Sequence, residues 1–115
     1  MREWGAFVVS VTDTIRTAME RITENRHRVV IVLDGRKVVG TVSDGDIRRA
    51  FLRDVLPLAP VTHIMNLNCR MTTERDPVRL RQLLQHEKVT VLPVVNDLNE
   101  LVDIALAYEP FGETV

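Results

Sequence analysis

The sequence predicts an α+β fold, within the broad α/β class, built from two tandem repeats packed about a pseudo-two-fold axis. Helical periodicity is twice followed by two apolar, strand-type runs joined by a turn. The two copies align when Ile31 is laid on Pro93, an offset of 62 residues that also places Ile22 on Leu84. Half of the chain leaves a large apolar face uncovered, so we expect the copies to pack together with a cleft between their sheets.

The first repeat, residues 1–55, should contain four elements in the order helix, strand, strand, helix. Thr12 or Asp13 is placed to cap the first helix, which should end near Asn25. The expected strands span residues 28–33 and 37–42, with a tight turn between them, and the second helix spans residues 46–54. Pro57 and Pro60 bar a continuing helix, so we expect residues 56–60 to form a linker.

The second repeat, residues 61–109, should repeat this order without its closing helix. Asp76 and Pro77 start a helix, because proline is well suited to a first helical position. The expected strands span residues 89–95 and 100–106, joined by a turn at 96–99. Pro110 and Gly112 disfavour a closing helix of ordinary length. Residues 110–115 are expected to be a tail leading to a C-terminal domain that is absent from the sequence.

Composition excludes several classes of function. Fifteen basic residues balance sixteen acidic ones, so no net field draws the chain to nucleic acid or to an anionic membrane. Cys69 is the single cysteine, which excludes an internal disulfide. No apolar run approaches the roughly eighteen residues of a membrane-spanning helix. Histidines at zinc spacing, a nucleophile–base pair and a P-loop are all missing from the sequence. We therefore expect a soluble, cytoplasmic domain with no metal, no cofactor and no catalytic activity of its own.

The stretch from Gly40 to Arg49 (GTVSDGDIRR) carries the candidate binding residues. First-turn amides of a helix lack partners and carry partial positive charge, so they can hold an anion. Asp46 suits ribose hydroxyls as an acceptor, and Arg48 and Arg49 suit a phosphate. The spacing of Ser43 and Asp46 is also that of a capping box, in which both side chains only satisfy helix amides. On the local sequence both interpretations stay open.

With this arrangement the chain resembles the cystathionine-β-synthase-type (CBS) domain pair, or Bateman module, over nearly its whole length. The resemblance is carried by residues 38–46 (VVGTVSDGD), 64–66 (IMN) and 92–95 (LPVV). It implies that Ser43 and Asp46 contact a ribose and phosphate, with Asp46 on the ribose hydroxyls. It also implies that the ligand is AMP, ADP or ATP, or sometimes S-adenosylmethionine. It also implies a base slot formed by the segment before the first helix and by the first strand. With the two arginines added, the candidate nucleotide-binding residues are Ser10, Val11, Thr12, Val30, Val32, Thr41, Ser43, Asp46, Arg48 and Arg49.

The second repeat departs from the pattern that marks the binding residues of the first. Leu106 replaces the hydroxyl of Ser43 with an apolar group, and Glu109 stands where Asp46 does. Four arginines of this copy can either reach into the cleft or lie on solvated helix faces: Arg70, Arg75, Arg79 and Arg81. We therefore expect one working site and one nucleotide per chain.

The phrase VSDGDIRRAF, residues 42–51, narrows the resemblance further. It is similar to the CBS pair found ahead of bacterial sugar-1-phosphate nucleotidyltransferase domains of the mannose-1-phosphate guanylyltransferase-like kind. A related phrase occurs in sugar-phosphate isomerases of the arabinose-5-phosphate type, but there the CBS pair comes last. The abrupt start of this chain favours the N-terminal module of a longer nucleotidyltransferase.

Two functions follow from the resemblance as expectations. The first is a regulatory module that senses an adenine nucleotide and modulates the fused catalytic domain. The alternative is a purely structural dimerisation module with no ligand. CBS pairs usually dimerise through their helices, so we expect a homodimer. Its interface should be formed by the apolar helix residues Ile15, Met19, Ile22, Phe51, Leu80 and Leu84.

Overall fold

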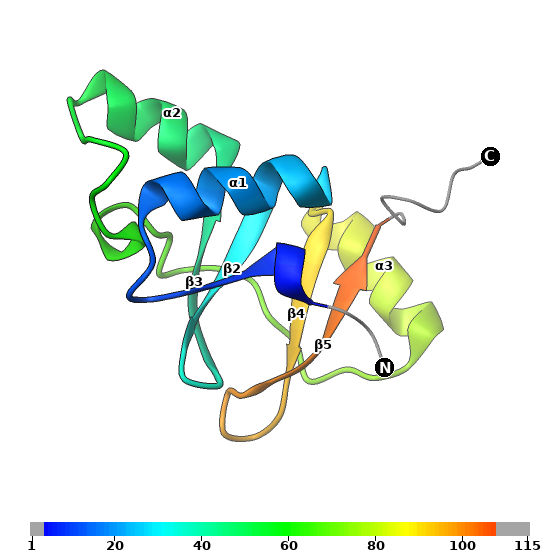
Figure 1. Cartoon of the computed structure of the whole chain (residues 1–115). Coiled ribbons are helices and arrows are strands. Elements are labelled where there is room, and N and C mark those ends of the chain that lie inside the picture. Colours follow the sequence, from blue (N-terminus) through cyan, green and yellow to red (C-terminus); the bar gives the residue numbers. More distant parts are fainter. Residues whose placement is uncertain (1–3, 108–115) are drawn as a thin grey trace.

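The computed structural model describes residues 4–107, which fold into two copies of the predicted unit (Figure 1). The first copy consists of the 3-10 helix η1 (Gly5–Phe7), β1 (Val8–Ser10), α1 (Ile15–Asn25), β2 (Val29–Asp34), β3 (Lys37–Ser43) and α2 (Asp44–Leu52). The second consists of the 3-10 helix η2 (Val61–His63), α3 (Pro77–Glu87), β4 (Val91–Val95) and β5 (Leu101–Leu106). β1 pairs parallel and β3 antiparallel with β2, while β4 and β5 form a second, antiparallel sheet.

The predicted repeat is confirmed at the level of single residues. Helix α3 begins and ends 62 residues after α1, and β4 begins 62 residues after β2. Each hairpin also carries a register shift at the corresponding step, between Val32 and Leu33 in one copy and between Val94 and Val95 in the other. The fold class expected from the sequence is therefore correct.

The two copies are joined by reciprocal hydrogen bonds between their hairpins. The Val38 N–H donates to the Asn99 carbonyl at 2.9 Å, and the Leu101 N–H donates to the Arg36 carbonyl at 2.9 Å. When one copy is superposed on the other, Val38 falls on Leu101 and Arg36 on Asn99, so each bond falls on the other. The pseudo-two-fold axis therefore passes between the two hairpins. Figure 1 shows both hairpin turns on the same side of the molecule, with α1 and α2 together over β2 and β3, and α3 beside the second sheet.

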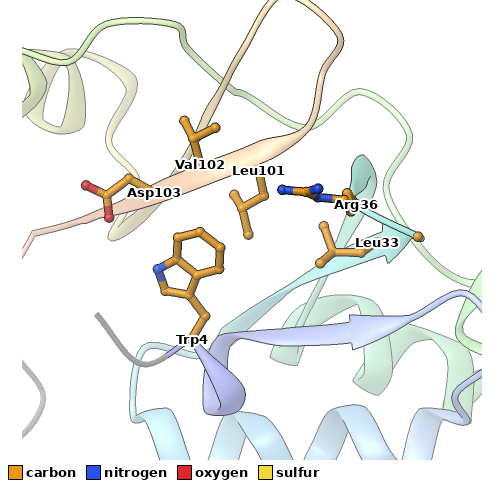
Figure 2. Close-up of a pocket in the computed structure, with 7 residues that line it drawn as sticks. Trp4, Leu33, Arg36, Leu101, Val102 and Asp103 are labelled. Carbon is orange, nitrogen blue, oxygen red and sulfur yellow. The ribbon is translucent and has the colours of Figure 1, made fainter. Parts of the chain in front are cut away.

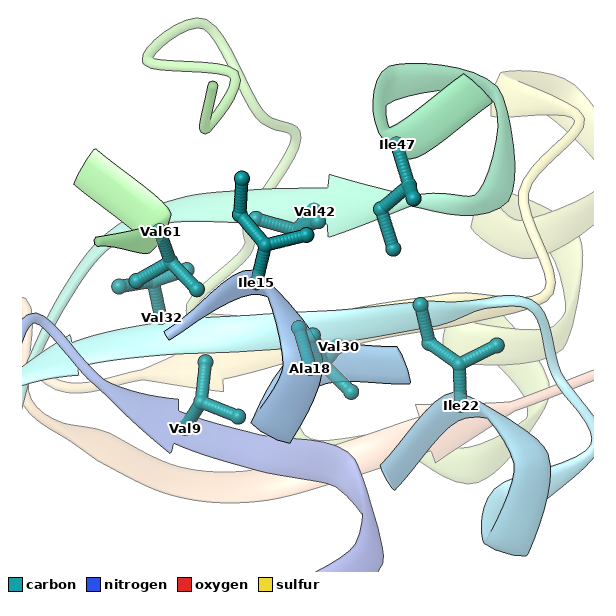
Figure 3. Packing of buried hydrophobic residues seen from close by; sticks show 9 residues of the cluster. All are labelled: Val9, Ile15, Ala18, Ile22, Val30, Val32, Val42, Ile47 and Val61. Carbon is teal, nitrogen blue, oxygen red and sulfur yellow. The ribbon is translucent and has the colours of Figure 1, made fainter. Parts of the chain in front are cut away.

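Alternation along β2 divides the core of the first copy. Val30 and Val32 are fully buried against α1, together with Ile15, Ala18 and other apolar side chains (Figure 3). Ile31 points to the opposite face and packs with side chains of the second sheet. Successive strand residues face opposite sides, so one strand serves both the helix-covered core and the contact between the copies.

The observed start of α1 corrects the predicted helix cap. Thr14 caps the helix, with its hydroxyl accepting the Thr17 N–H at 3.2 Å, and neither Thr12 nor Asp13 does so. Asp13 is engaged elsewhere, because its carboxylate accepts the Ser10 N–H at 2.7 Å. The three-residue strand β1, which was not predicted, ends at the same turn. A strand that short carries no readable alternation, and it forms because it pairs with β2.

The linker between the copies is docked on α1. The Ala59 carbonyl accepts the Ile15 N–H at 2.9 Å, and the Pro57 carbonyl accepts the Arg16 N–H at 2.8 Å. First-turn amides of a helix need such outside acceptors. The linker backbone thus completes the N-terminus of α1, while the Leu56 and Leu58 side chains remain 70% and 71% exposed.

Other element boundaries also differ from those predicted. Helix α2 begins at Asp44, two residues early, because Ser43 is its cap. Strand β4 begins at Val91, because the Val89 N–H still bonds the Leu84 carbonyl at the end of α3. The predicted residues Glu109 to Val115 lie outside the described part of the chain. Within residues 4–107, no helix combines the length and apolar character needed to cross a membrane.

The helix residues expected to form a dimer interface do not share one exposed face. Ile15, Ile22 and Leu84 are buried inside the chain, at 0%, 6% and 5% exposure, so they cannot contribute to such an interface. Met19 and Phe51 are each 37% exposed. The periodicity of the sequence identified apolar faces, but α1 and α3 use theirs to cover their own sheets.

Gly40 is required by the close approach of the chain after η2. A Cβ atom at this position would lie 2.9 Å from the Asn66 carbonyl oxygen and 3.3 Å from the Met65 side chain. We predict that Gly40→Ala lowers the free energy of unfolding by about 1–3 kcal/mol, because the contact is with backbone that cannot yield easily. Urea denaturation measures the loss. Gly5→Ala is the matched control, since a Cβ there meets nothing within 4 Å. Equal midpoints for the two variants would contradict the close contact.

Candidate functional site

The N-terminus of α2 forms the capping box that the sequence left open. The Ser43 hydroxyl accepts the Asp46 N–H at 3.1 Å, and the Asp46 carboxylate accepts the Ser43 N–H at 2.9 Å. The other carboxylate oxygen pairs with the Arg49 guanidinium at 2.8 Å. The Arg28 carbonyl accepts the Asp44 N–H at 3.0 Å. Side chains and backbone thus occupy several amides that would otherwise be open to an anion, and the Asp46 side chain is 19% exposed.

A cavity of about 460 Å³ opens beside Ser43, between the two copies. Its lining residues come from three places: the ends of β2 and β3, the segment after η2, and the segment between α3 and β4. They are His27, Val29, Thr41, Ser43, Asn66, Asn68, Cys69, Arg70, Lys88, Val89, Thr90 and Val91. The volume lies within the range of small-molecule sites.

Direct contacts between the copies hold the walls of this cavity in place. The Thr41 and Asn66 backbones exchange two hydrogen bonds, at 3.2 and 2.7 Å. The Thr90 hydroxyl donates to the His27 carbonyl at 3.2 Å. Hydrogen bonds between the two copies therefore fix the cavity walls relative to each other.

His27 is a structural residue of the wall. Its ring nitrogen Nδ1 lies 2.8 Å from the Asn25 carbonyl, and its backbone N–H donates to the Asn25 side chain at 2.7 Å. The ring also packs edge-on against Phe7, with centroids 5.4 Å apart. His27 is only 2% exposed. His27 thus positions the turn after α1. From the sequence alone it was visible only as a residue that recurs in the repeat.

Two of the ten predicted nucleotide-binding residues, Thr41 and Ser43, line the cavity. Ser10, Val11 and Thr12 lie elsewhere, because Ser10 pairs with Leu33 at the opposite end of β2 from Ser43. Their partners on β2, Leu33 and Val29, are four residue steps apart, a distance of about 13 Å. The hydroxyls of Ser10 and Thr12 instead bond each other at 3.0 Å.

The predicted role of Val30 and Val32 as walls of a base slot is not compatible with their burial. Both side chains have zero exposure and face α1. The alternate residues of β2 face the other copy, and Val29 is the β2 residue that lines the cavity. The sequence pointed to a strand that reaches the cavity but could not tell which of its faces does so, since a shift of one residue exchanges the two.

Arg48 and Arg49 lie on α2 outside the cavity lining, and Arg49 is paired with Asp46. The cationic side chains that do line it are Arg70 and Lys88, of which Arg70 also pairs with Glu87 at 3.0 Å. Arg70 was one of four arginines that the sequence allowed to reach the cleft. Lys88 was missed, although it follows α3 at the position where Arg26 follows α1. Both residues have left-handed backbones, with φ of 58° and 60°.

A cysteine also lines the cavity. Burial raises the pKa of the Cys69 thiol above its ordinary value, so this residue stays protonated near neutral pH. Within residues 4–107, no group of three His, Cys, Asp or Glu side chains is placed to hold a metal ion. The site is suited to binding through hydroxyls, backbone groups and two cations.

The counterpart of this region in the second copy is different. Leu106 and its neighbours on β5 line a separate cavity of about 300 Å³, with Arg75 and Arg81 at its edge. This groove between α3 and β5 corresponds to the place that α2 covers in the first copy. Glu109, the predicted equivalent of Asp46, lies outside the described residues.

Comparison with protein families and curated relatives agrees with this architecture. Residues 3–53 match the model of the CBS domain. A Helicobacter pylori protein, named only as uncharacterized, is 27% identical over 100 residues that cover 84% of this chain and 30% of that protein. The chain therefore spans less than a third of the length of that relative.

Solved structures of CBS domains share the fold of the whole chain. The CBS domains of a transcriptional regulator from Streptococcus pneumoniae have a TM-score of 0.73 at 19% identity, covering 97% of this chain and 92% of that one. A CBS domain protein from Pyrobaculum aerophilum, complexed with AMP, has a TM-score of 0.68 at 21% identity, covering 87% and 79%. A CBS domain pair in complex with 5′-methylthioadenosine and S-adenosyl-L-methionine has a TM-score of 0.66 at 17% identity, covering 88% and 84%. Residues 3–53 thus match the CBS-domain family model, and the chain as a whole has the fold of solved CBS domain pairs.

Proposed function

We propose that this chain is a regulatory module that binds one adenine nucleotide, AMP, ADP or ATP, in the cavity beside Ser43. The observation that carries the proposal is a cavity of ligand size in which hydroxyls, apolar side chains and cations converge from both copies. Similar folds that hold AMP or S-adenosylmethionine support the same class of ligand.

The chemistry of the lining suggests how a nucleotide is held. Val29, Val89 and Val91 offer apolar surface to a base. The phosphate goes to Arg70 and Lys88, which is a change from the predicted pair Arg48 and Arg49. Asp46 accepts from ribose hydroxyls while it keeps its capping bonds, since a carboxylate has about four acceptor positions. Among the residues assigned to base, phosphate and ribose, Asp46 is the one that does not line the cavity.

A ligand in this position acts on the relation between the two copies. It contacts the first copy at Thr41 and Ser43 and the second at residues 88–91, so its binding favours one arrangement of the pair. In our proposal this bias is transmitted to a fused, cytoplasmic sugar-phosphate nucleotidyltransferase. A sugar-phosphate isomerase is the alternative parent. The longer curated relative is compatible with a fused partner of either kind.

A structural dimerisation module remains the second candidate, and two observations favour it. The capping box is complete without any ligand. In addition, apolar side chains of α2 and the linker are exposed: Phe51 at 37%, Leu52 at 80%, Leu56 at 70% and Leu58 at 71%. We include a homodimer in both candidates and place its interface on these residues and on Met19, in place of the buried helix residues predicted from sequence.

A nucleotide panel separates the two candidates. We predict that one of AMP, ADP and ATP raises the unfolding midpoint, because a ligand at one hundred times its dissociation constant adds about 2.7 kcal/mol to the stability of the folded state. Differential scanning fluorimetry measures the shift, and calorimetry should give one site per chain. A chain that responds to no nucleotide would favour the structural module. Two equal sites per chain would contradict the expected asymmetry.

Asp46→Ala tests the role of the carboxylate. We predict a loss of about 1.5–3 kcal/mol in nucleotide binding, from the lost acceptor, and of about 1 kcal/mol in stability, from the lost cap. Asp44→Ala is the matched control, because Asp44 lies in the same first turn without a capping role. Calorimetry on both variants should show weaker binding only for the first. Unchanged binding by Asp46→Ala would remove Asp46 from the site.

The exposed apolar side chains of α2 provide a test of the dimer. Light scattering at tens of micromolar should give about twice the chain mass of 13.1 kDa. We predict that Phe51→Glu with Leu52→Glu yields a monomer, since charged side chains are costly to bury in an interface. Leu98→Glu, at a 63% exposed position in the turn between β4 and β5, should leave the dimer intact. A wild-type chain that scatters as a monomer would overturn the proposed homodimer.

A further inference from the structure

A second, larger cavity lies between the hairpin of the first copy and β5. Its volume is about 810 Å³, and it is lined by Trp4, Leu33, Gly35, Arg36, Leu101, Val102 and Asp103. It shares none of these residues with the cavity beside Ser43. It is not the pseudo-symmetric counterpart of that cavity either, because Ile104 and Leu106, which correspond to Thr41 and Ser43, do not line it.

This second cavity arises from a difference between the copies. Trp4 corresponds to Asn66, and Asp103 corresponds to Gly40. In the other half of the molecule the equivalent space is closed, because Met65 and the Asn66 carbonyl lie directly against Gly40. The tryptophan and the carboxylate line an open space in this half.

The lining has an apolar centre with a charge at either side. Figure 2 shows the indole of Trp4 facing Leu101, with Arg36 on one side of the ring and Asp103 on the side of the indole nitrogen. The aromatic face and the leucines suit a flat ring. Arg36 lies on the exposed hairpin turn of the first copy.

Trp4 carries an unmet hydrogen-bond donor. The indole Nε1 is buried and has no hydrogen-bond partner among the described residues. Buried polar atoms are normally paired, and an unpaired donor is costly. A ligand on the open face of the ring does not pair with this covered atom.

We propose that this cavity binds a small planar aromatic anion, with its ring on Trp4 between Leu33 and Leu101 and its negative group on Arg36. A nucleoside phosphate and an aromatic carboxylate share this chemistry. Such a ligand bridges the two copies at their hairpins. The site is independent of the nucleotide proposed beside Ser43, because the two cavities share no lining residue.

The emission of Trp4 reports on this cavity directly, because it is the only tryptophan in the chain. We excite at the red edge of its absorption and titrate two matched pairs, AMP with adenosine and benzoate with benzamide. We expect a saturable change with AMP or with benzoate, and binding weaker by about ten-fold for the neutral member of that pair. A response to AMP identifies a nucleotide as the source of the anion, and a response to benzoate identifies an aromatic acid.

Variants separate this site from the one beside Ser43. Arg36→Gln should remove the preference for the anion, and Arg53→Gln, at an exposed position after α2, should keep it. Asp46→Ala should leave the response of Trp4 unchanged. The proposal is overturned if no probe changes the emission saturably or if neutral probes bind equally well. It is also overturned if Asp46→Ala abolishes the response, since the signal would then come from the other cavity.

Discussion

Two reciprocal hydrogen bonds between the hairpins, Val38 to Asn99 and Leu101 to Arg36, fix how the copies face each other. Each hairpin supplies one donor and one acceptor, so a slide of one copy would break both bonds together and leave backbone groups unpaired. Both cavities between the copies depend on this register. The cavity beside Ser43 has walls from two sheets, and the larger one lies next to the hydrogen-bonded residues themselves.

Features set by local chemistry were predictable from the sequence. The repeat offset, the start of α3 at Pro77 and the cap at Ser43 depend on apolar spacing and on residues that satisfy helix amides. The lining of the site was less predictable, because it depends on long-range contacts. Apolar character does not tell which face of β2 meets the other copy, so Val30 was expected where Val29 lies. Lys88 lines the cavity only because the two sheets meet.

The two copies show how one backbone arrangement accommodates different surfaces. Where the first has Gly40, the chain after η2 can approach until a carbonyl oxygen lies 2.9 Å from the position of a Cβ atom. Where the second has Asp103, such an approach is blocked and an open space remains. The offset that relates the helices and strands is preserved throughout. The two copies therefore differ at residues that lie between them, while the helices and strands that define the repeat keep their spacing.

The docking of the linker on α1 has a mechanical consequence. Pro57 and Ala59 hold the first turn of this helix, and Asn25 at its last turn holds the backbone of His27 in the wall of the cavity. Eleven helical residues, about 16 Å, separate these two attachments. An α-helix is stiff over that length, so a displacement of the linker cannot be absorbed between them. Helix α1 acts as a rigid rod whose two ends move together, one at the junction of the copies and the other beside the cavity.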